Sequence, residues 1–297
     1  MKCDLCPRKC LVDRKKGEKG ICGQTENLKV ARAALHFWEE PCISGDAGSG
    51  AVFFSGCPLH CVFCQNENIA NGTVGKEISL ERLVDIFLEL QEKRANNINL
   101  VTPGHFVPQI VKALDQARRE GLTLPVVYNT SSYETVDTIK MLEGYVDIYL
   151  PDFKYMSPVL SKKYSHAPDY AEVAKAAIAE MVRQTGKAVF VNGEEDNLIL
   201  SGTIVRHLTL PGCMADSMQI LKYLHDTYGD MIYISIMNQF TPLSNLEKYP
   251  ELNRRITDEE YETLVDYAID IGIENGFIQE GDTAEESFIP AFDCEGV

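Results

Sequence analysis

Three cysteines on one short segment carry the clearest chemical signal in the sequence. Cys57, Cys61 and Cys64 form a C-x3-C-x2-C run directly after the apolar stretch 51–54. Three thiolates this close together can hold three irons of a cubane [4Fe–4S] cluster. The fourth iron then has no protein ligand on this segment, and an open iron can bind a substrate or a cofactor. The alternatives are a zinc knuckle or structural cysteines, although a knuckle normally brings a fourth protein ligand.

A second group of cysteines lies near the N-terminus. Cys3, Cys6, Cys10 and Cys22 stand in a segment that is rich in Lys and Gly and poor in residues that form a core. So short a segment cannot fold on apolar burial alone and usually needs a metal. Four thiolates match tetrahedral zinc or an auxiliary [4Fe–4S] cluster equally well, and free or redox-active thiols are the third possibility. Cys42 could replace one ligand.

Composition limits the possible classes of protein. The chain has 297 residues, of which 45% are apolar, enough for one large domain. Its net charge of −16 argues against general nucleic-acid binding. No apolar run approaches the roughly 18 residues that span a bilayer. The sequence begins Met-Lys-Cys without an apolar signal segment, so we expect the cytoplasm, where clustered cysteines bind metal more often than they form disulfides.

The charge is unevenly distributed along the chain. Residues 1–32 carry nine Lys or Arg against four Asp or Glu. No Lys or Arg follows Arg255, whereas residues 258–295 supply thirteen acidic residues. The acidic end is either a solvated helix and tail, or a docking face for a basic partner or for the chain's own N-terminus.

From residue 51 onward, short apolar runs alternate with helical patterns. The expected strands are 51–54, 98–102, 125–130, 146–153, 204–210 and 231–237, and the expected helices are 80–94, 107–120, 133–143, 171–184, 216–228 and 257–275. This alternation implies βαβ crossovers and a parallel sheet, and periodicity alone allows either a barrel or an open sheet. Asn192-Gly193 predicts an added β-hairpin over 188–202. We expect a metal-binding extension at 1–45, with the glycine-rich stretch 45–50 as a hinge, and a main domain at 46–297.

Polar residues follow the expected strands at their carboxyl ends, where parallel barrels build active sites. They are Thr102 and His105 after the second strand, Asn129 at the third, Asp152 and Lys154 after the fourth, Arg206 in the fifth and Asn238 after the sixth. One polar strand end would be an ordinary loop, but a succession of them indicates a site.

The cysteine motif, with the aromatic Phe63 just before its last cysteine, resembles that of the radical S-adenosylmethionine (SAM) superfamily. The resemblance implies a partial (β/α)6 TIM-type barrel and a [4Fe–4S] cluster on Cys57, Cys61 and Cys64. In that family the open iron chelates the amino and carboxylate groups of SAM, and an electron from the cluster cleaves SAM to methionine and a 5′-deoxyadenosyl radical. It also implies anaerobic oxidoreductase chemistry and a reductant such as flavodoxin or ferredoxin.

Within the superfamily, residues 51–242 look most like the activating enzymes of glycyl radical enzymes, of the pyruvate formate-lyase activase type. Matching motifs are Asn129-Thr130, Asp152-Phe153-Lys154 and Val205-Arg206 with Pro211-Gly212. The resemblance implies that Lys154 donates to the SAM carboxylate or ribose and that Asp152 and Asn129 offer oxygen ligands. Phe63, Thr102, Arg206 and Asn238 are further expected cofactor contacts.

Two departures set this chain apart from the activases. Their Gly-Gly-Glu after the second strand reads Thr102-Pro103-Gly104-His105 here, and their histidine near the sixth strand reads Asn238-Gln239. His105 is therefore a candidate proton donor or substrate contact, or a polar loop residue whose hydrogen bonds are satisfied. The expected substrate is a glycine of a partner glycyl radical enzyme, or else a small molecule or peptide. Outside this class, the chain would be a metal-binding scaffold or electron carrier without SAM chemistry.

Overall fold

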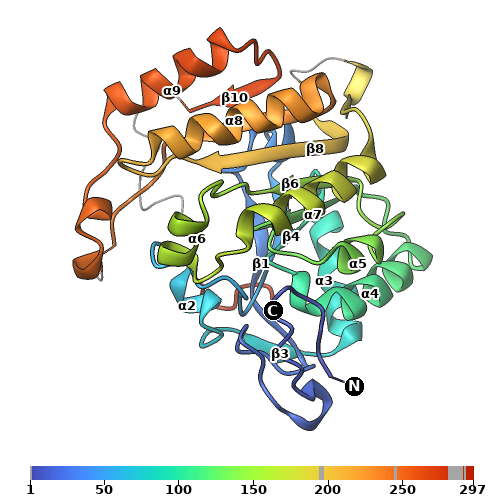
Figure 1. The fold of residues 1–297 in the computed structure, drawn as a ribbon. Coiled ribbons are helices and arrows are strands. Elements are labelled where there is room, and N and C mark those ends of the chain that lie inside the picture. The colour runs from blue at the N-terminus through green and yellow to red at the C-terminus, as the bar shows by residue number, and fades with distance from the viewer. Residues whose placement is uncertain (1, 194–196, 244–245, 280–289, 291) are drawn as a thin grey trace.

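A mostly parallel sheet organises the computed structural model, which describes residues 2–193, 197–243, 246–279, 290 and 292–297. The strand order is β10-β9-β8-β6-β5-β4-β2-β1-β3. These strands are β1 (Leu28–His36), β2 (Ser49–Phe54), β3 (Lys76–Ile78), β4 (Ile98–Val101), β5 (Val126–Thr130), β6 (Ile148–Pro151), β8 (Ile199–Leu208), β9 (Tyr233–Met237) and β10 (Gly276–Ile278). Along this order, neighbouring strands from β2 to β10 pair in parallel, and β1 is antiparallel to both of its neighbours. The sheet is open and barrel-like, as the sequence predicts (Figure 1).

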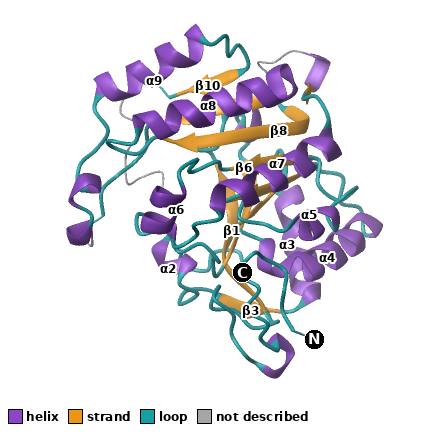
Figure 2. Ribbon diagram, viewed as in Figure 1, coloured by secondary structure: helices purple, strands orange, loops and turns teal. Residues whose placement is uncertain are grey.

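Helices connect the parallel strands and cover the outside of the sheet (Figure 2). They are α1 (Pro41–Ser44), α2 (Glu67–Ala70), α3 (Leu80–Glu92), α4 (Val107–Arg119), α5 (Val136–Lys140), α6 (Pro158–Ser165), α7 (Tyr170–Thr185), α8 (Met214–Tyr228) and α9 (Asp258–Asp270). Ser79 caps α3 by accepting the Arg82 N–H. Thr257 and Glu260 form a capping box at the start of α9.

The strands read as continuous apolar runs because both of their faces are buried. All residues of β2, β4, β5 and β6 are buried. One part of the core lies between α3, α4 and the first parallel strands. A second, rich in aromatic residues, packs α7 and α8 against the later strands and the cysteine loop. These two cores hold the carboxyl ends of the strands in fixed positions around one space.

Strand β1 was not predicted, and it moves the start of the sheet to Leu28. It pairs with β2 along most of its length, although its sequence LKVARAALH lacks a simple alternation. The structure thus puts β1 in the sheet and Cys42 and Ile43 in the core, inside the segment 1–45 that the sequence assigned to the extension. Within the glycine-rich stretch 45–50, Ser49 and Gly50 are the first residues of β2. Cys42 is buried among core residues such as Ile43 and Ile148.

The predicted hairpin is present and the acidic end of the chain docks on its own sheet. Strand β7 (Val189–Phe190) pairs antiparallel with β8. At the C-terminus, the Ala33 N–H donates to the carbonyl of Glu295 at 2.9 Å. Arg32 of β1 forms ion pairs with Asp293 at 3.0 Å and with Glu295 at 2.5 Å. Part of the acidic end therefore contacts Arg32, at the end of the basic segment 1–32 of its own chain. In the described part of the chain, no helix is long and apolar enough to cross a membrane.

Candidate active site

A cavity of about 500 Å³ lies inside the barrel, and most of the expected site residues line it. This size is typical of small-molecule sites. The structure brings together residues that are far apart in the sequence: Cys57, Cys61, Phe63, Cys64, Thr102, Asn129, Asp152, Lys154 and Arg206. They come from the loop after β2 and from the ends of β4, β5, β6 and β8. The rule that strand carboxyl ends meet at one edge explains this convergence.

The loop after β2 directs hydrogen-bond donors at the cysteine sulfurs. The Leu59 N–H donates to Cys57 Sγ at 3.4 Å, two residues along the chain. The Asn66 N–H makes the same contact with Cys64, again two residues along. Ser165 at the end of α6 donates its hydroxyl to Cys61 Sγ at 3.0 Å. Hydrogen bonds to sulfur stabilise thiolates and tune iron–sulfur clusters, so the loop is prepared for metal ligation.

Burial of these thiols also fits a metal cluster. Burial raises the pKa of Cys61 to about 11 and of Cys64 to about 12, so in the absence of a cation both stay protonated at neutral pH. A bound cationic centre supplies the charge that the thiolates need. Within the described residues, no three Cys, His, Asp or Glu side chains are gathered around a single ion. A cubane does not require that, because each thiolate binds a different iron.

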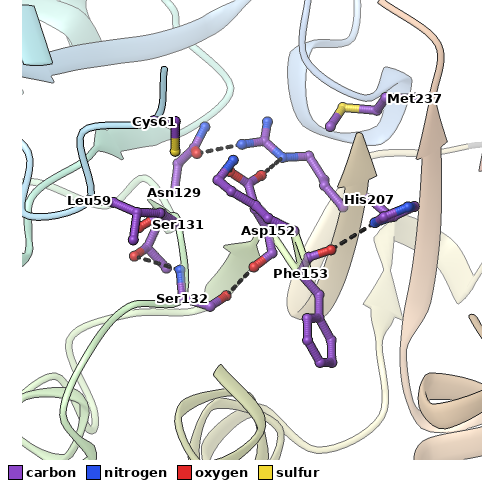
Figure 3. A network of polar contacts seen from close by, with 12 residues as sticks. Leu59, Cys61, Asn129, Ser131, Ser132, Asp152, Phe153, His207 and Met237 are labelled. Carbon is purple, nitrogen blue, oxygen red and sulfur yellow. Dashed lines mark hydrogen bonds and ion pairs between the residues drawn. The ribbon is translucent and has the colours of Figure 1, made fainter. Parts of the chain in front are cut away.

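A chain of charged side chains runs from the cysteine loop across the cavity (Figure 3). Lys154 Nζ donates to Asp152 Oδ2 at 2.7 Å. Arg206 Nε donates to the other carboxylate oxygen of Asp152 at 3.0 Å. The Arg206 guanidinium also donates to Asn129 Oδ1 at 2.7 Å and to Glu39 Oε2 at 3.0 Å. These contacts fix the orientation of Asn129, Asp152, Lys154 and Arg206, four of the polar residues that the sequence assigned to SAM.

The mutual attraction of these charges keeps them ionised despite their burial. Burial would raise the pKa of Asp152, but Lys154 and Arg206 outweigh it and hold that pKa below its usual value. Burial would lower the pKa of Lys154, but Asp152 and Cys61 raise it above its usual value. An ammonium group is therefore maintained beside the cysteine sulfurs at neutral pH.

Glu39 and Glu40 complete the cavity wall, and the sequence did not predict them. They follow β1, which crosses the barrel in the opposite direction to the other strands. Glu39 Oε1 accepts hydrogen bonds from Asn99 at 3.0 Å and Asn129 at 3.2 Å. Glu40 is only 8% exposed, and its Oε2 has no hydrogen-bond partner among the described residues. Burial raises the pKa of Glu40, although Arg206 opposes the shift. The Glu40 carboxyl also takes part in a hydrogen bond with the Ser235 side chain, so only its Oε2 is left without a donor.

Thr102 lies in the cavity wall in an unusual backbone conformation. Its φ of 54° is in the left-handed region that glycine adopts easily and β-branched residues rarely do. The Thr102 N–H donates to the carbonyl of Asn129 at 2.9 Å, which holds this conformation. The activases have glycine at the start of this strand end. Thr102 therefore adopts the left-handed backbone conformation that a glycine would adopt more easily at this position.

Two expected site residues lie outside the cavity wall, so far as the structure describes it. His105 is 2% exposed, and its Nε2 contacts the carbonyl of Ser55 at 2.7 Å. Burial lowers its pKa to about 3, so the ring is neutral and supports the start of the cysteine loop rather than facing a ligand. The Asn238 N–H is bonded to Gln279 Oε1 at 2.9 Å. Gln239 and Phe240 line the cavity in its place.

The N-terminal cysteines form a separate group beside the cysteine loop. Cys6 and Cys22 are buried, and Cys3 and Cys10 are partly buried. The sulfurs of Cys10 and Cys22 flank Gly20, where an added Cβ would lie 2.9 and 3.6 Å from them. Among the described residues lining the cavity, none comes from this segment.

Comparison with known proteins places this site in a family. Residues 51–199, which is half of the chain, match the model of the radical SAM superfamily. The chain therefore belongs to that superfamily, and the resemblance read from the cysteine motif is confirmed. The chain is a radical SAM enzyme: SAM and a [4Fe–4S] cluster are the cofactors of the family, and radical chemistry is its reaction class.

Relatives and similar structures agree on the fold without defining the substrate. An uncharacterized protein of Methanocaldococcus jannaschii, MJ0674, is 28% identical over 275 residues, which cover 90% of this chain and 74% of that protein. Streptococcus suis SuiB bound to SAM has a TM-score of 0.52 at 12% identity, covering 76% of this chain and 48% of SuiB. HydG, a maturase of the [FeFe]-hydrogenase, has a TM-score of 0.51 at 15% identity, covering 78% and 52%. The chain spans about half the length of these two proteins, and the likeness shows a shared fold.

Proposed function

We propose that this enzyme uses SAM as the source of a 5′-deoxyadenosyl radical that removes a hydrogen atom from a carbon of its substrate. The observation that carries the proposal is the position of Lys154. Its ammonium group pairs with Asp152 at 2.7 Å, and its charge acts on Cys61, so a cation stands beside the cluster ligands. Once bound, the [4Fe–4S] cluster supplies the electron that cleaves SAM, and flavodoxin or ferredoxin is the class of reductant that would provide it.

The chain's own residues bind and orient SAM. Lys154 is placed to donate to the SAM carboxylate, and Asp152 and Asn129, held by Arg206, offer oxygens to the ribose hydroxyls. Phe63 and Phe240 pack edge to face with ring centres 5.9 Å apart in the cavity wall. This apolar side keeps water away from the place where the radical forms.

We favour a small molecule or a peptide as substrate. The Glu40 carboxyl belongs to the cavity wall, and its Oε2 has no hydrogen-bond partner among the described residues. A bound ligand with an amino, amide or hydroxyl donor would satisfy this oxygen.

A glycine of a partner glycyl radical enzyme is the second candidate. Its support is that the three activase-like motifs at Asn129, Asp152 and Arg206 meet in one hydrogen-bonded network. His105, predicted as a catalytic residue, is not among the described residues that line the cavity, so our proposal includes no proton transfer through it. All ten cysteines are free thiols, which fits our proposal that the enzyme works in the reducing cytoplasm.

Anaerobic reconstitution tests the proposed reaction. Protein loaded with iron and sulfide is mixed with SAM and dithionite, and 5′-deoxyadenosine is measured. Formation of 5′-deoxyadenosine supports the enzyme class, and its absence from fully loaded protein supports a scaffold or electron carrier. A glycyl radical signal by electron paramagnetic resonance, after adding a glycyl radical enzyme encoded beside this gene, would favour the activase over the small-molecule enzyme.

A further inference from the structure

We infer that Cys3, Cys6, Cys10 and Cys22 hold a second thiolate metal centre, and that this centre fixes the loop that carries the SAM cluster. The inference goes beyond the proposed function and does not depend on it. The metal is of the thiophilic class. Among the described residues, no three ligand side chains are gathered around a single ion, which favours a [4Fe–4S] cluster, whose thiolates each bind a different iron, and makes one zinc ion the second outcome of the test.

The first support is a backbone turn that the two cysteine groups share. The Arg8 N–H is hydrogen-bonded to the sulfur of Cys6, and the Gln24 N–H to the sulfur of Cys22. Each donor lies two residues after its cysteine, as Leu59 does after Cys57. In the SAM-cluster loop this turn belongs to metal ligands. Because the same turn occurs at Cys6 and Cys22, we infer that these two sulfurs are also metal ligands.

The second support is that the segment folds back on itself around its cysteines without an apolar core of its own. The Cys3 N–H donates to Val12 at 2.9 Å and the Leu11 N–H returns to Cys3 at 3.0 Å, which closes a loop around Cys6 and Cys10. Leu11 and Ile21 are exposed by 51% and 48%, so these large apolar side chains do not stabilise the loop. Metal binding supplies order to such segments.

The segment is attached to the SAM-cluster loop through Arg8. Its guanidinium donates to three backbone carbonyls: Pro58 at 2.8 Å, His166 at 2.6 Å and Ser165 at 3.1 Å. Pro58 follows Cys57 directly, and Ser165 is the residue whose hydroxyl donates to Cys61. Arg8 also stacks on the Tyr133 ring at 5.0 Å. Arg8, two residues after the proposed ligand Cys6, therefore contacts both the cysteine loop at Pro58 and the end of α6 at Ser165.

Further contacts make this attachment close. The carbonyl of Cys22 lies only 2.5 Å from where a Cβ on Gly56 would stand, so a side chain there would collide with it. Gly56 has a φ of 93°, which glycine adopts easily, and it directly precedes Cys57. His60 Nε2 contacts the carbonyl of Ile21 at 2.8 Å. A metal that orders residues 3–22 thus orders the backbone on which the SAM-cluster cysteines stand.

Metal analysis tests the second site separately from SAM chemistry. The variant with Cys57, Cys61 and Cys64 all changed to Ala, prepared anaerobically with iron and sulfide, is expected to keep about one zinc or about four irons per chain. Adding Cys6→Ser and Cys22→Ser should remove that metal. Neither metal in the triple variant, with its four N-terminal thiols open to titration, would overturn the inference.

The metal content of the unaltered protein gives a test that does not depend on a cysteine variant folding correctly. Two clusters predict about eight irons, and a zinc site predicts about four irons and one zinc, by elemental analysis and Mössbauer spectroscopy. About four irons without zinc would overturn the second site. The two outcomes also have different meanings. Only an iron–sulfur cluster would make the segment a candidate electron relay to the SAM site.

A matched pair of arginine variants tests the attachment to the loop. Arg8→Gln should keep the N-terminal metal but lose SAM-cluster iron to a chelator at least about fivefold faster, because the hydrogen bonds that hold the loop are gone. Arg118→Gln is the control, because Arg118 also donates to two backbone carbonyls and stacks on a tyrosine, far along the chain from either cysteine group. Equal rates of iron loss in Arg8→Gln, Arg118→Gln and the unaltered protein would refute the coupling.

Discussion

The two cysteine groups use one local turn but are set in different surroundings. In both, a backbone N–H two residues along the chain donates to a cysteine sulfur. The loop after β2 brings three cysteines to the edge of a cavity, next to the Lys154 ammonium. The N-terminal segment carries four cysteines, and none of its described residues lines that cavity.

The difference teaches what separates a reactive metal site from a closed one. Three ligands beside a cavity leave one position where a second molecule can bind. Four ligands fill a metal's coordination, as in structural zinc sites. The chain therefore has a reactive site at the loop after β2 and, we propose, a structural metal site in the N-terminal segment. Arg8 connects the two.

The largest expected effect is the loss of the SAM-cluster ligands. Cys57→Ala, Cys61→Ala or Cys64→Ala leaves too few thiolates for a cubane with one open iron, so SAM-cluster iron and 5′-deoxyadenosine should both fall to background. Cys213→Ala is the control, since Cys213 is a partly buried free cysteine at the start of α8. If any of the three variants kept the iron content and the 5′-deoxyadenosine yield of the unaltered protein, Cys57, Cys61 and Cys64 would not be the ligands of the SAM cluster.

The next effect sharpens the role of the cation beside the loop. Lys154→Ala should weaken SAM binding by roughly tenfold to a hundredfold, because a charge-assisted hydrogen bond contributes about 1.5–3 kcal/mol. Calorimetry on reconstituted protein measures it. Lys222→Ala is the matched control, as Lys222 pairs with Asp226 at 2.8 Å on the surface of α8. Unchanged affinity in Lys154→Ala would remove Lys154 from the site and leave the cluster assignment standing.

Much of this site could be predicted because it follows the strands. The residues at Asn129, Asp152, Lys154 and Arg206 stand at carboxyl ends of parallel strands, and those ends must meet. The cysteine loop is a local motif, so its chemistry is readable without a structure. Apolar runs located the six strands of the barrel because both of their faces are buried.

The rest depends on long-range contacts that leave no local pattern. Glu39 and Glu40 reach the cavity only because β1 enters the sheet antiparallel, and a strand with Arg32 at its centre has weak periodicity. A signal was present in the apolar residues of 28–35, but no turn motif marked them as an added strand. His105 follows β4 as a site residue would, yet its ring turns back to the carbonyl of Ser55. Sequence position gives the strand end, and packing decides which way a side chain points.

The adjacent acids of the cavity wall should differ in their effect on stability. Glu39→Gln weakens its contact with Arg206 and should cost about 2 kcal/mol, the effect of breaking a buried charged hydrogen bond. Glu40→Gln replaces a carboxyl that has an unpaired oxygen, so stability should hold or rise by up to about 1 kcal/mol. Denaturant unfolding of both variants measures the difference. If Glu40→Gln proved as costly as Glu39→Gln, Glu40 would be a structural residue and not one that waits for a ligand.

The smallest expected effect concerns a buried histidine that supports the reactive site from behind. His207 on β8 contacts the carbonyl of Phe153 through Nδ1 and the hydroxyl of Ser217 through Nε2, both at 2.8 Å. Burial lowers its pKa to about 4 in the folded protein. As pH falls below the usual histidine pKa of about 6.5, the unfolded chain takes up a proton that the folded chain refuses, so stability decreases.

His207→Gln removes this proton uptake and should flatten the fall in stability between pH 6.5 and pH 5 by up to about 2 kcal/mol. The stabilising contribution is complete above pH 6.5 and is lost progressively toward pH 4, so the two proteins should diverge only on the acidic side. Urea unfolding at matched pH values, on protein whose metal content is checked at each pH, gives the slope. Parallel curves would mean that His207 binds protons equally in the folded and unfolded chains, so that burial does not lower its pKa.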